Sequence, residues 1–340
     1  MKYIGLSQQR ANNNFKSTLL LILFPVLVVG LTFIGCFAFN YFIGHQTQGY
    51  YDKYDNFIEY EQQNYASNAE ILNNSIGMFI NIVPLVIGAV LIWFLIAFFA
   101  NTAMINRATG SHGLERKDNM RIYNLVENLC MSCGMTMPKI NVIEDDSLNA
   151  FASGLNKKNY TVTLTRGIIN KLDDQELEGV IAHELTHIRN RDVRLLIISI
   201  VFVGIFAMLA QIAMRVMWYG GGRSNSKNDK GGAIVIIIAL VLAIIGYIFA
   251  ILMRFAISRQ REYMADAGAA ELTKNPWALA SALRKISADP VVESVTRDDV
   301  AQLFISHPMK EKNSGLFSSF NKLFATHPPI NKRIEFLEQI

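Results

Sequence analysis

Four long stretches without a charged residue constrain this 340-residue chain more than any other feature. A helix needs about 20 apolar residues to cross the roughly 30 Å hydrocarbon core of a bilayer. The last two stretches are close to that minimum, which leaves a buried hairpin or a re-entrant pair as their alternative. We expect about four transmembrane helices, over residues 18–43, 76–100, 195–214 and 231–253.

The Lys and Arg residues around these stretches predict the orientation of the chain. The first 16 residues carry three basic and no acidic residues, whereas residues 45–74 carry one Lys against five acidic residues. Cytoplasmic loops hold an excess of Lys and Arg. We therefore expect loop 45–74 outside and the chain from residue 107 onward in the cytoplasm, in a multi-pass protein of the plasma (inner) membrane. The loop between the third and fourth stretches carries three basic residues and fits less well, but its flanks are richer in Arg.

The apolar stretches divide the chain into membrane and soluble parts. The soluble parts have a mostly helical pattern with a few strands, so we predict an α+β fold class. Its parts are an N-terminal membrane region, a first soluble part, a transmembrane hairpin and a second soluble part, over residues 1–106, 107–193, 194–255 and 256–340.

Local patterns predict the elements of the first soluble part. Residues 121–133 have helical periodicity, and residues 139–144 and 160–165 alternate as short strands. Asp173 followed three residues later by Glu176 predicts a helix start. We expect that helix to continue past residue 190.

This last helix carries a His-Glu-x-x-His motif, residues 183–187. Residues four apart lie one turn apart on the same helix face, so His183 and His187 can bind one metal ion at about 2.0–2.1 Å. Glu184 lies in the same arc and can take a proton from a metal-bound water. A chance match occurs in on the order of one chain in a hundred of this length. The motif therefore predicts a catalytic Zn²⁺ site, with one ion per chain.

A catalytic zinc needs a third protein ligand and an open fourth position. Glu262 follows the fourth stretch as closely as His187 precedes the third. An antiparallel hairpin brings these two ends together, so we predict Glu262 as the third ligand. Asp266, one turn further on, can accept the second N–H of a ligand histidine. The alternative for both carboxylates is a solvated helix face paired with Arg259 and Arg261.

Composition argues against several other classes of protein. Only 18% of the residues are charged, against about a quarter in soluble proteins. The net charge of +4 without a basic, aromatic-rich run argues against nucleic-acid binding. Cys36, Cys130 and Cys133 provide neither a disulfide framework nor a zinc ribbon, and we interpret them as packing residues in a reducing compartment.

Beyond the bare motif, the chain resembles the HtpX family of membrane zinc metalloproteases, which is related to the type I prenyl-protein endopeptidases. The resemblance covers most of the chain from about residue 100. It rests on His183-Glu184-x-x-His187, Arg261-Glu262-x-x-Ala265-Asp266, Asn149-Ala150-Phe151-Ala152-Ser153-Gly154, and His327-Pro328-Pro329 followed by Arg333-Ile334.

The resemblance implies a zincin-like metallopeptidase domain with His183, His187 and Glu262 on the zinc and Glu184 as the catalytic carboxylate. Within that frame, Asn149 and Ala150 are expected in an edge strand that binds an extended substrate. His327 is expected to donate a hydrogen bond to the oxyanion. The alternatives for these are a plain loop and a helix-capping turn. The chain departs from better-known members in its long acidic loop 45–74 and in an insertion over residues 310–321, neither of which touches the metal chemistry.

From the sequence we expect a membrane-embedded endopeptidase that hydrolyses peptide bonds of membrane or membrane-proximal proteins in protein quality control. Its expected partners are protein substrates and the lipid bilayer. One alternative is a non-catalytic membrane scaffold with a structural zinc, for which His327 is the candidate fourth ligand. Another is a transporter, which the lack of charged residues inside the apolar stretches disfavours.

Overall fold

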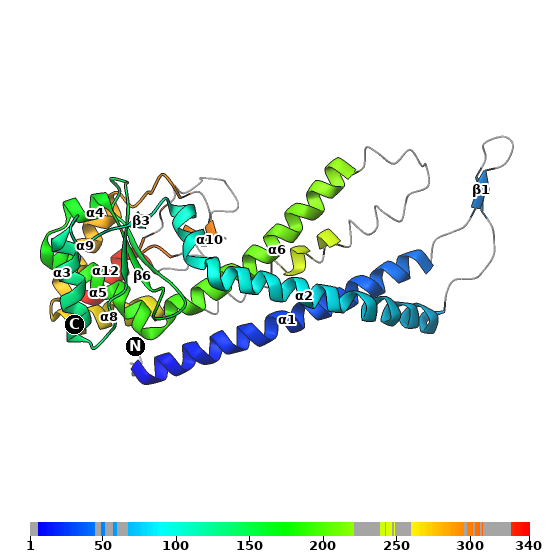
Figure 1. The fold of residues 1–340 in the computed structure, drawn as a ribbon, viewed down its shortest axis with the longest axis horizontal. Helices are drawn as coiled ribbons and strands as arrows, with labels where there is room; N and C mark the ends of the chain where they lie inside the picture. Colours follow the sequence, from blue (N-terminus) through cyan, green and yellow to red (C-terminus); the bar gives the residue numbers. More distant parts are fainter. Residues whose placement is uncertain are drawn as a thin grey trace. The chain divides into compact units, whose positions relative to one another are not determined.

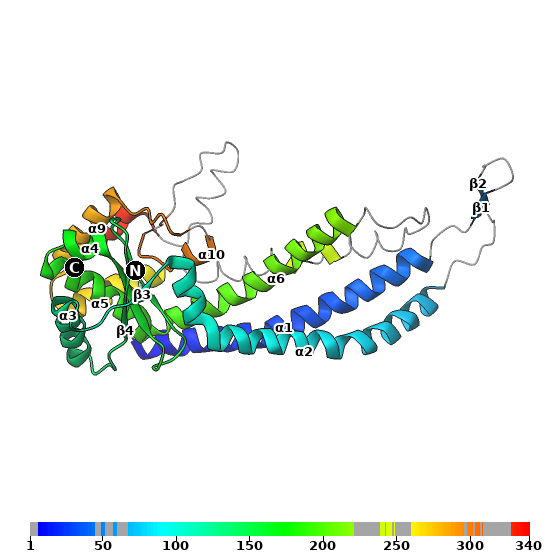
Figure 2. The ribbon, with the colours of Figure 1, turned by 45° about the horizontal axis from the view of Figure 1, so that its top comes forward.

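The computed structural model describes residues 6–44, 49–51, 57–59, 67–220, 239–241, 243–246, 248, 260–295, 298–301, 303–306, 308 and 328–340 (Figures 1 and 2). The chain folds into two compact units. The first contains Met1–Leu20, Leu95–Val201 and Leu252–Ile340, and the second contains Leu21–Phe94 and Phe202–Ile251.

The second unit is built from long apolar helices. Helix α1 (Leu6–Gly44), α2 (Asn68–Thr109) and α6 (Asp192–Gly220) each cross from one unit into the other. Two helices in the described part have the length and composition to cross a membrane, over Ala11–Phe42 and Asn68–Thr109. Helix α6 contains the third predicted stretch. In the fourth stretch the described residues from 239 to 248 are helical, and its remainder lies outside the described residues.

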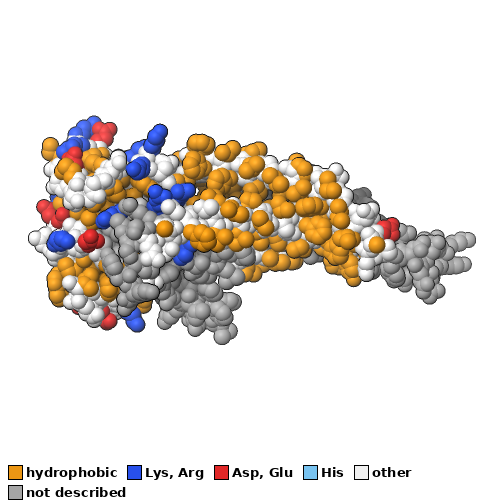
Figure 3. Space-filling model, turned by 90° about the horizontal axis from the view of Figure 1, so that it is seen from below, with side chains coloured by type: hydrophobic (Ala, Val, Ile, Leu, Met, Phe, Trp, Pro, Cys, Tyr) orange, Lys and Arg blue, Asp and Glu red, His pale blue; other side chains and the backbone are white. Residues whose placement is uncertain are grey.

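Most side chains of the two candidate spans face outward. Only 17% of the most apolar window of the first span and 6% of that of the second are buried. Figure 3 shows hydrophobic side chains covering this region of the surface. Contacts inside the unit include aromatic pairs, such as the stacked rings of Phe24 and Phe202 with centroids 4.0 Å apart. Such a surface requires an apolar solvent around it.

The loop between α1 and α2 contains a short hairpin and is shorter than we predicted. Strand β1 (Gly49–Tyr51) pairs antiparallel with β2 (Phe57–Glu59). Helix α2 begins at residue 68, so the last residues of the predicted loop 45–74 are helical. Ser67 explains the early start, since its Oγ accepts a hydrogen bond from the N–H of Glu70 at 3.2 Å.

A four-stranded sheet lies in the first unit. It contains β3 (His112–Gly113), β4 (Lys139–Ile143), β5 (Ala150–Ser153) and β6 (Thr161–Thr165), in the order β3-β4-β6-β5. Strands β4 and β6 run parallel, and the other pairs are antiparallel. The predicted strands 139–144 and 160–165 are thus present, and β5 lies at an edge.

Most helices of the first unit gather on one side of this sheet (Figure 1). Helix α5 (Asp174–Asn190) lies against β5 and β6 and is surrounded by neighbouring helices. These neighbours are α3 (Met120–Ser132), α8 (Gln260–Thr273) and α9 (Pro276–Ala288). The smaller helices are α4 (Arg166–Lys171), α10 (Asp298–Ala301) and α12 (Ile330–Leu337).

Both ends of α5 are fixed locally. Asp173 and Glu176 form the capping box that the sequence predicted, each side chain accepting a hydrogen bond from the backbone N–H of the other. The prediction that this helix continues past Asn190 was wrong. Arg191 has φ 63° and ψ 22°, a left-handed conformation that ends α5, and α6 begins at the next residue.

Candidate metal centre

Helix α5 presents two imidazoles and a carboxylate on its buried face. His183 is fully buried, Glu184 is 2% exposed, and the side chain of His187 is 12% exposed. The Nε2 atoms of the two histidines lie 3.1 Å apart. The one-turn spacing of the motif therefore brings the two Nε2 atoms close enough to bind the same ion.

Helix α8 adds the third donor. Oε2 of Glu262 lies 3.7 Å from Nε2 of His183, and Oε1 of Glu262 lies 3.7 Å from Nε2 of His187. Ligand atoms 2.0–2.1 Å from a tetrahedral ion are separated by about 3.3–3.4 Å. The three side chains can present ligand atoms within 4.8 Å of one another. The two nitrogens and one oxygen therefore have the chemistry and spacing of a zinc site.

His183 is oriented by a buried charged pair. Oδ1 of Asp266 accepts a hydrogen bond from Nδ1 of His183 at 3.0 Å. Arg333 of α12, itself fully buried, donates to both oxygens of Asp266 at 2.7 and 2.9 Å. The sequence predicts Asp266 as the acceptor for a ligand histidine. For Arg333 it gives only a place in the family motif, without a role. The arrangement keeps the proton on Nδ1 and turns Nε2 toward the ligand cluster.

His187 has a matching carboxylate. Oδ2 of Asp192, the first residue of α6, accepts from Nδ1 of His187 at 2.9 Å. Sequence reasoning missed Asp192. An acidic residue directly after the end of a ligand helix was the signal that could have identified it.

The carboxylates and the burial perturb the ionisation of the site. Burial raises the pKa of Glu184, and the nearby imidazoles offset this only in part. Burial alone lowers the pKa of His187, but the charges of Glu262 and Asp192 outweigh it and raise that pKa to about 10. Burial likewise raises the pKa of Asp266, and Arg333 and His183 outweigh it, so that this pKa is lowered. A metal ion needs the neutral imidazole, so its binding must displace a proton here.

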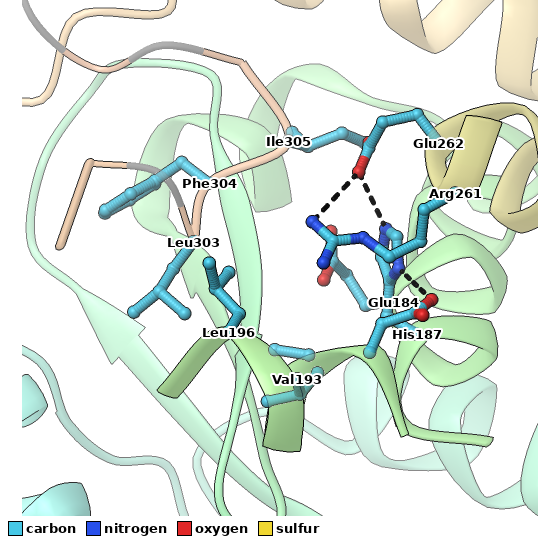
Figure 4. Close-up of a pocket in the computed structure, with 11 residues that line it drawn as sticks. Glu184, His187, Val193, Leu196, Arg261, Glu262, Leu303, Phe304 and Ile305 are labelled. Atoms are coloured by element: carbon cyan, nitrogen blue, oxygen red, sulfur yellow. Dashed lines mark hydrogen bonds and ion pairs between the residues drawn. The ribbon is translucent and has the colours of Figure 1, made fainter. Parts of the chain in front are cut away.

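A pocket opens beside these groups. Figure 4 shows Glu262 of α8 directed toward His187 and the guanidinium of Arg261 beside Glu262, with Leu303 and Phe304 on the opposite side of the pocket. Arg261 is 7% exposed, and its Nη2 lies 3.8 Å from Oε1 of Glu262. The pocket therefore combines the donor cluster with an apolar wall.

The edge strand β5 also contributes to the pocket, through Ala152. The carbonyl of Ala150 accepts a hydrogen bond from the N–H of Ile305 at 2.8 Å. Asn149 is fully buried, and its amide donates to the carbonyls of Pro290 and Ser306 at 2.8 and 2.9 Å. A substrate-binding role for Asn149 and Ala150 stays a prediction, and His327 lies outside the described residues.

Sequence comparisons with known proteins point the same way as the geometry. The family model for peptidase family M48 matches residues 116–340. A protease HtpX homolog of Bacteroides fragilis is 60% identical over all of both chains. A second, from Thermoanaerobacter pseudethanolicus, is 42% identical over 64% of this chain and 71% of its own. Among solved structures, S. mikatae Ste24p aligns with 74% of this chain and 57% of its own, with 20% identity and a TM-score of 0.44, too low to carry an argument.

Proposed function

This chain belongs to peptidase family M48 and to the HtpX proteases within it, and we propose that it is a zinc-dependent endopeptidase whose ion is held by His183, His187 and Glu262. The observation that carries the proposal is the convergence of these three donors beside Glu184. Two imidazoles and one carboxylate are a donor set that would hold one zinc ion per chain, as in catalytic zinc sites.

Different side chains are proposed to have different roles in hydrolysis. Held by His183, His187 and Glu262, zinc would act as a Lewis acid that lowers the pKa of water to about 7. Glu184 takes the proton of the attacking water and delivers it to the leaving amine. Its buried position raises its pKa, which makes the carboxylate a better proton acceptor. Asp266 and Asp192 keep the imidazole Nδ1 atoms protonated, so that both Nε2 lone pairs remain available as ligands.

The substrate is proposed to bind along β5. Residues Asn149 and Thr165 pair through the Thr165 N–H and the Asn149 carbonyl. Hydrogen-bonded positions alternate along an antiparallel strand, so the backbone groups of Ala152 point to the outer edge, at the pocket. Phe151 already forms an antiparallel bridge with Phe304 on that side, so an extended peptide must displace this bridge to pair with β5 and present a bond to Glu184. His327 remains our candidate for the oxyanion donor.

Membrane or membrane-proximal proteins are the proposed substrates, in quality control at the cytoplasmic face of the plasma (inner) membrane. The short distance along the chain from the site to a predicted membrane span supports a site near the membrane. Helix α6, which contains the third apolar stretch, begins five residues after His187. The distribution of Lys and Arg supports the cytoplasmic side. In this proposal the chain crosses the bilayer four times, with soluble parts 107–193 and 256–340 combined into the peptidase domain.

The test measures bound zinc per chain and cleavage of an unfolded model protein, in detergent, for wild type, Glu184→Gln and Glu262→Ala. We expect one zinc and cleavage in the wild type, zinc without cleavage in Glu184→Gln, and neither in Glu262→Ala. If the wild type binds zinc tightly but does not cleave, a non-catalytic scaffold with a structural zinc becomes the better account.

A further inference from the structure

An asparagine far from the ligand helix in sequence reaches its end. Asn13 lies in α1 and is 3% exposed. Its Nδ2 donates to Oδ1 of Asp192 at 2.7 Å and to the carbonyl of Asn190 at 2.9 Å. All three residues lie in the first unit. A single side chain of α1 thus contacts both the last turn of α5 and the acid that follows it.

The contact continues to the metal centre. The second oxygen of Asp192 accepts from Nδ1 of His187 at 2.9 Å, while Nε2 of His187 points to His183 and Glu262. Asp192 is 2% exposed, and each of its oxygens has one donor. A buried carboxylate held at both oxygens has little freedom to rotate, so it fixes the ring that it contacts.

Neighbouring residues show that the contact is specific to one position. Three asparagines follow one another at residues 12–14. Asn12 is exposed, and Asn14 accepts from the side chain of Arg191 at 2.7 Å. An amide buried at the start of an apolar helix is unfavourable unless it is hydrogen-bonded. Of the three, only Asn13 has its amide on Asp192.

We propose that Asn13 is a positioning residue for the metal ligand His187 and acts through Asp192; this rests on the proposed metal site. His183 has the equivalent arrangement, in which Arg333 holds Asp266. Both ligand histidines therefore depend on a donor from a distant part of the chain. For His187 that donor is neutral and belongs to the first apolar helix, so the start of α1 is part of the metal centre.

The test uses the full chain in detergent with Co²⁺ as the probe, and measures its Kd by competition with a chelator. Loss of an outer partner of a ligand histidine weakens metal binding by about 10–100-fold. We expect Asn13→Leu to raise the Kd about tenfold, at the lower end of that range because Asp192 itself remains. Asn12→Leu, the matched control, should leave the Kd unchanged. In the Asp192→Leu background, Asn13→Leu should have no further effect.

Stoichiometry separates positioning from folding. A variant that only folds poorly binds less Co²⁺ per chain at an unchanged Kd, and that result would overturn the proposal. A Kd for Asn13→Leu equal to that of wild type would also overturn it, as would the full tenfold loss in the Asp192→Leu background. If wild type binds no Co²⁺, or Glu262→Ala binds it as tightly as wild type, the metal site itself is wrong.

Discussion

Asp266 serves two neighbours at once, because it accepts a hydrogen bond from His183 and neutralises the buried Arg333. Removing one member of a buried ion pair leaves the other charge without compensation, which costs about 3–5 kcal/mol. The same side chain therefore affects both metal affinity and stability. The two effects can be separated by removing the buried charge of Arg333 together with that of Asp266.

Asp266→Asn is expected to weaken zinc binding by about 10–100-fold, because an amide can donate to Nδ1 and favour the wrong tautomer. Stability should fall by about 3–5 kcal/mol, because Arg333 loses the negative charge that accepts two of its hydrogen bonds. Chelator competition and urea unfolding in detergent measure the two effects. In the double variant Asp266→Asn, Arg333→Met the stability should recover while zinc binding stays weak. Recovery of zinc affinity in the double variant would contradict the tautomer argument.

At the residue scale, spacing predicted only part of the site. His183, Glu184 and His187 follow from helical geometry, and Glu262 from the assumption of a hairpin. Asn13 and Arg333 could not be found in this way, because they lie 179 residues before Asp192 and 67 residues after Asp266. Nothing local distinguishes them, and only the fold brings them to the site.

At the element scale, the helix pair α5 and α8 brings the third donor to the first two. The pair approaches closely at Gly268, where a Cβ would lie 2.5 Å from Cγ2 of Thr186, a residue of the motif itself. Thr186 is 2% exposed and its hydroxyl donates to the carbonyl of Ala182 at 2.8 Å. The close approach of α5 and α8 thus depends on the absence of a side chain at Gly268.

Gly268→Ala is expected to separate these helices and destabilise the protein by about 1–3 kcal/mol, as overpacking does. Zinc affinity should fall with it, because Glu262 moves with α8. Thr186→Ser removes Cγ2 and should restore part of both losses. Gly88→Ala is the matched control, because a Cβ added at that position would meet nothing within 4 Å. Melting temperature and zinc Kd that are unchanged in Gly268→Ala would show that the helices adapt without cost.

The capping box also joins α5 to α9. Oε1 of Glu176 accepts from Ser281 at 2.7 Å, and Oε2 accepts from Lys285 at 2.6 Å. Burial alone raises the pKa of Glu176, but these bonds and the Asp173 N–H outweigh it and lower that pKa. The stabilisation is therefore present above the unfolded pKa of about 4.3 and is lost as pH falls through the lower folded pKa.

Glu176→Gln is expected to reduce the free energy of unfolding at pH 7 by about 1.5–3 kcal/mol, the range for a hydrogen bond to a charged group. The difference from wild type should begin to shrink below about pH 4.3, where the unfolded carboxylate takes up a proton, and should be lost once the pH falls below the lowered pKa of the folded carboxylate. Urea midpoints at several pH values measure this, with Glu178→Gln on the same helix as control. A difference that does not change with pH would assign the effect to packing instead.

Element types were more predictable than element ends. Strands β4 and β6 and the start of α5 followed from alternation and from the capping box. The break at Arg191 did not, because a left-handed residue is usually Gly or Asn and Arg gives no such signal. Strand β3 has two residues and exists only because β4 pairs with it.

At the scale of the whole molecule, the exposed apolar side chains of the long helices require an apolar environment. Leu85 of α2 is 76% exposed and Phe99 is 78% exposed, in a helix that the protein itself leaves mostly uncovered. Lipid must cover these side chains if the chain is to remain dispersed. The apolar stretches could be predicted from composition alone, whereas the packing between them could not.

Leu85→Asp is expected to reduce membrane insertion, because a carboxylate near the middle of a span costs about 2.5–3.5 kcal/mol. The fraction of chains that resists carbonate extraction from membranes measures it. Leu85→Ala, which removes bulk without adding charge, should insert as wild type does. Equal insertion of the two variants would mean that position 85 does not face lipid.

The separation of the proposed metal ligands along the chain affects when a growing chain can complete the site. Glu262 follows His187 by 75 residues, and a ribosome adds about 5–20 residues per second. For roughly 4–15 seconds a growing chain therefore carries both imidazoles and Glu184 without the third ligand. During that interval it has too few donors for a catalytic centre. A nascent protease of this design cannot cut the proteins beside it until both of its later apolar stretches have been synthesised.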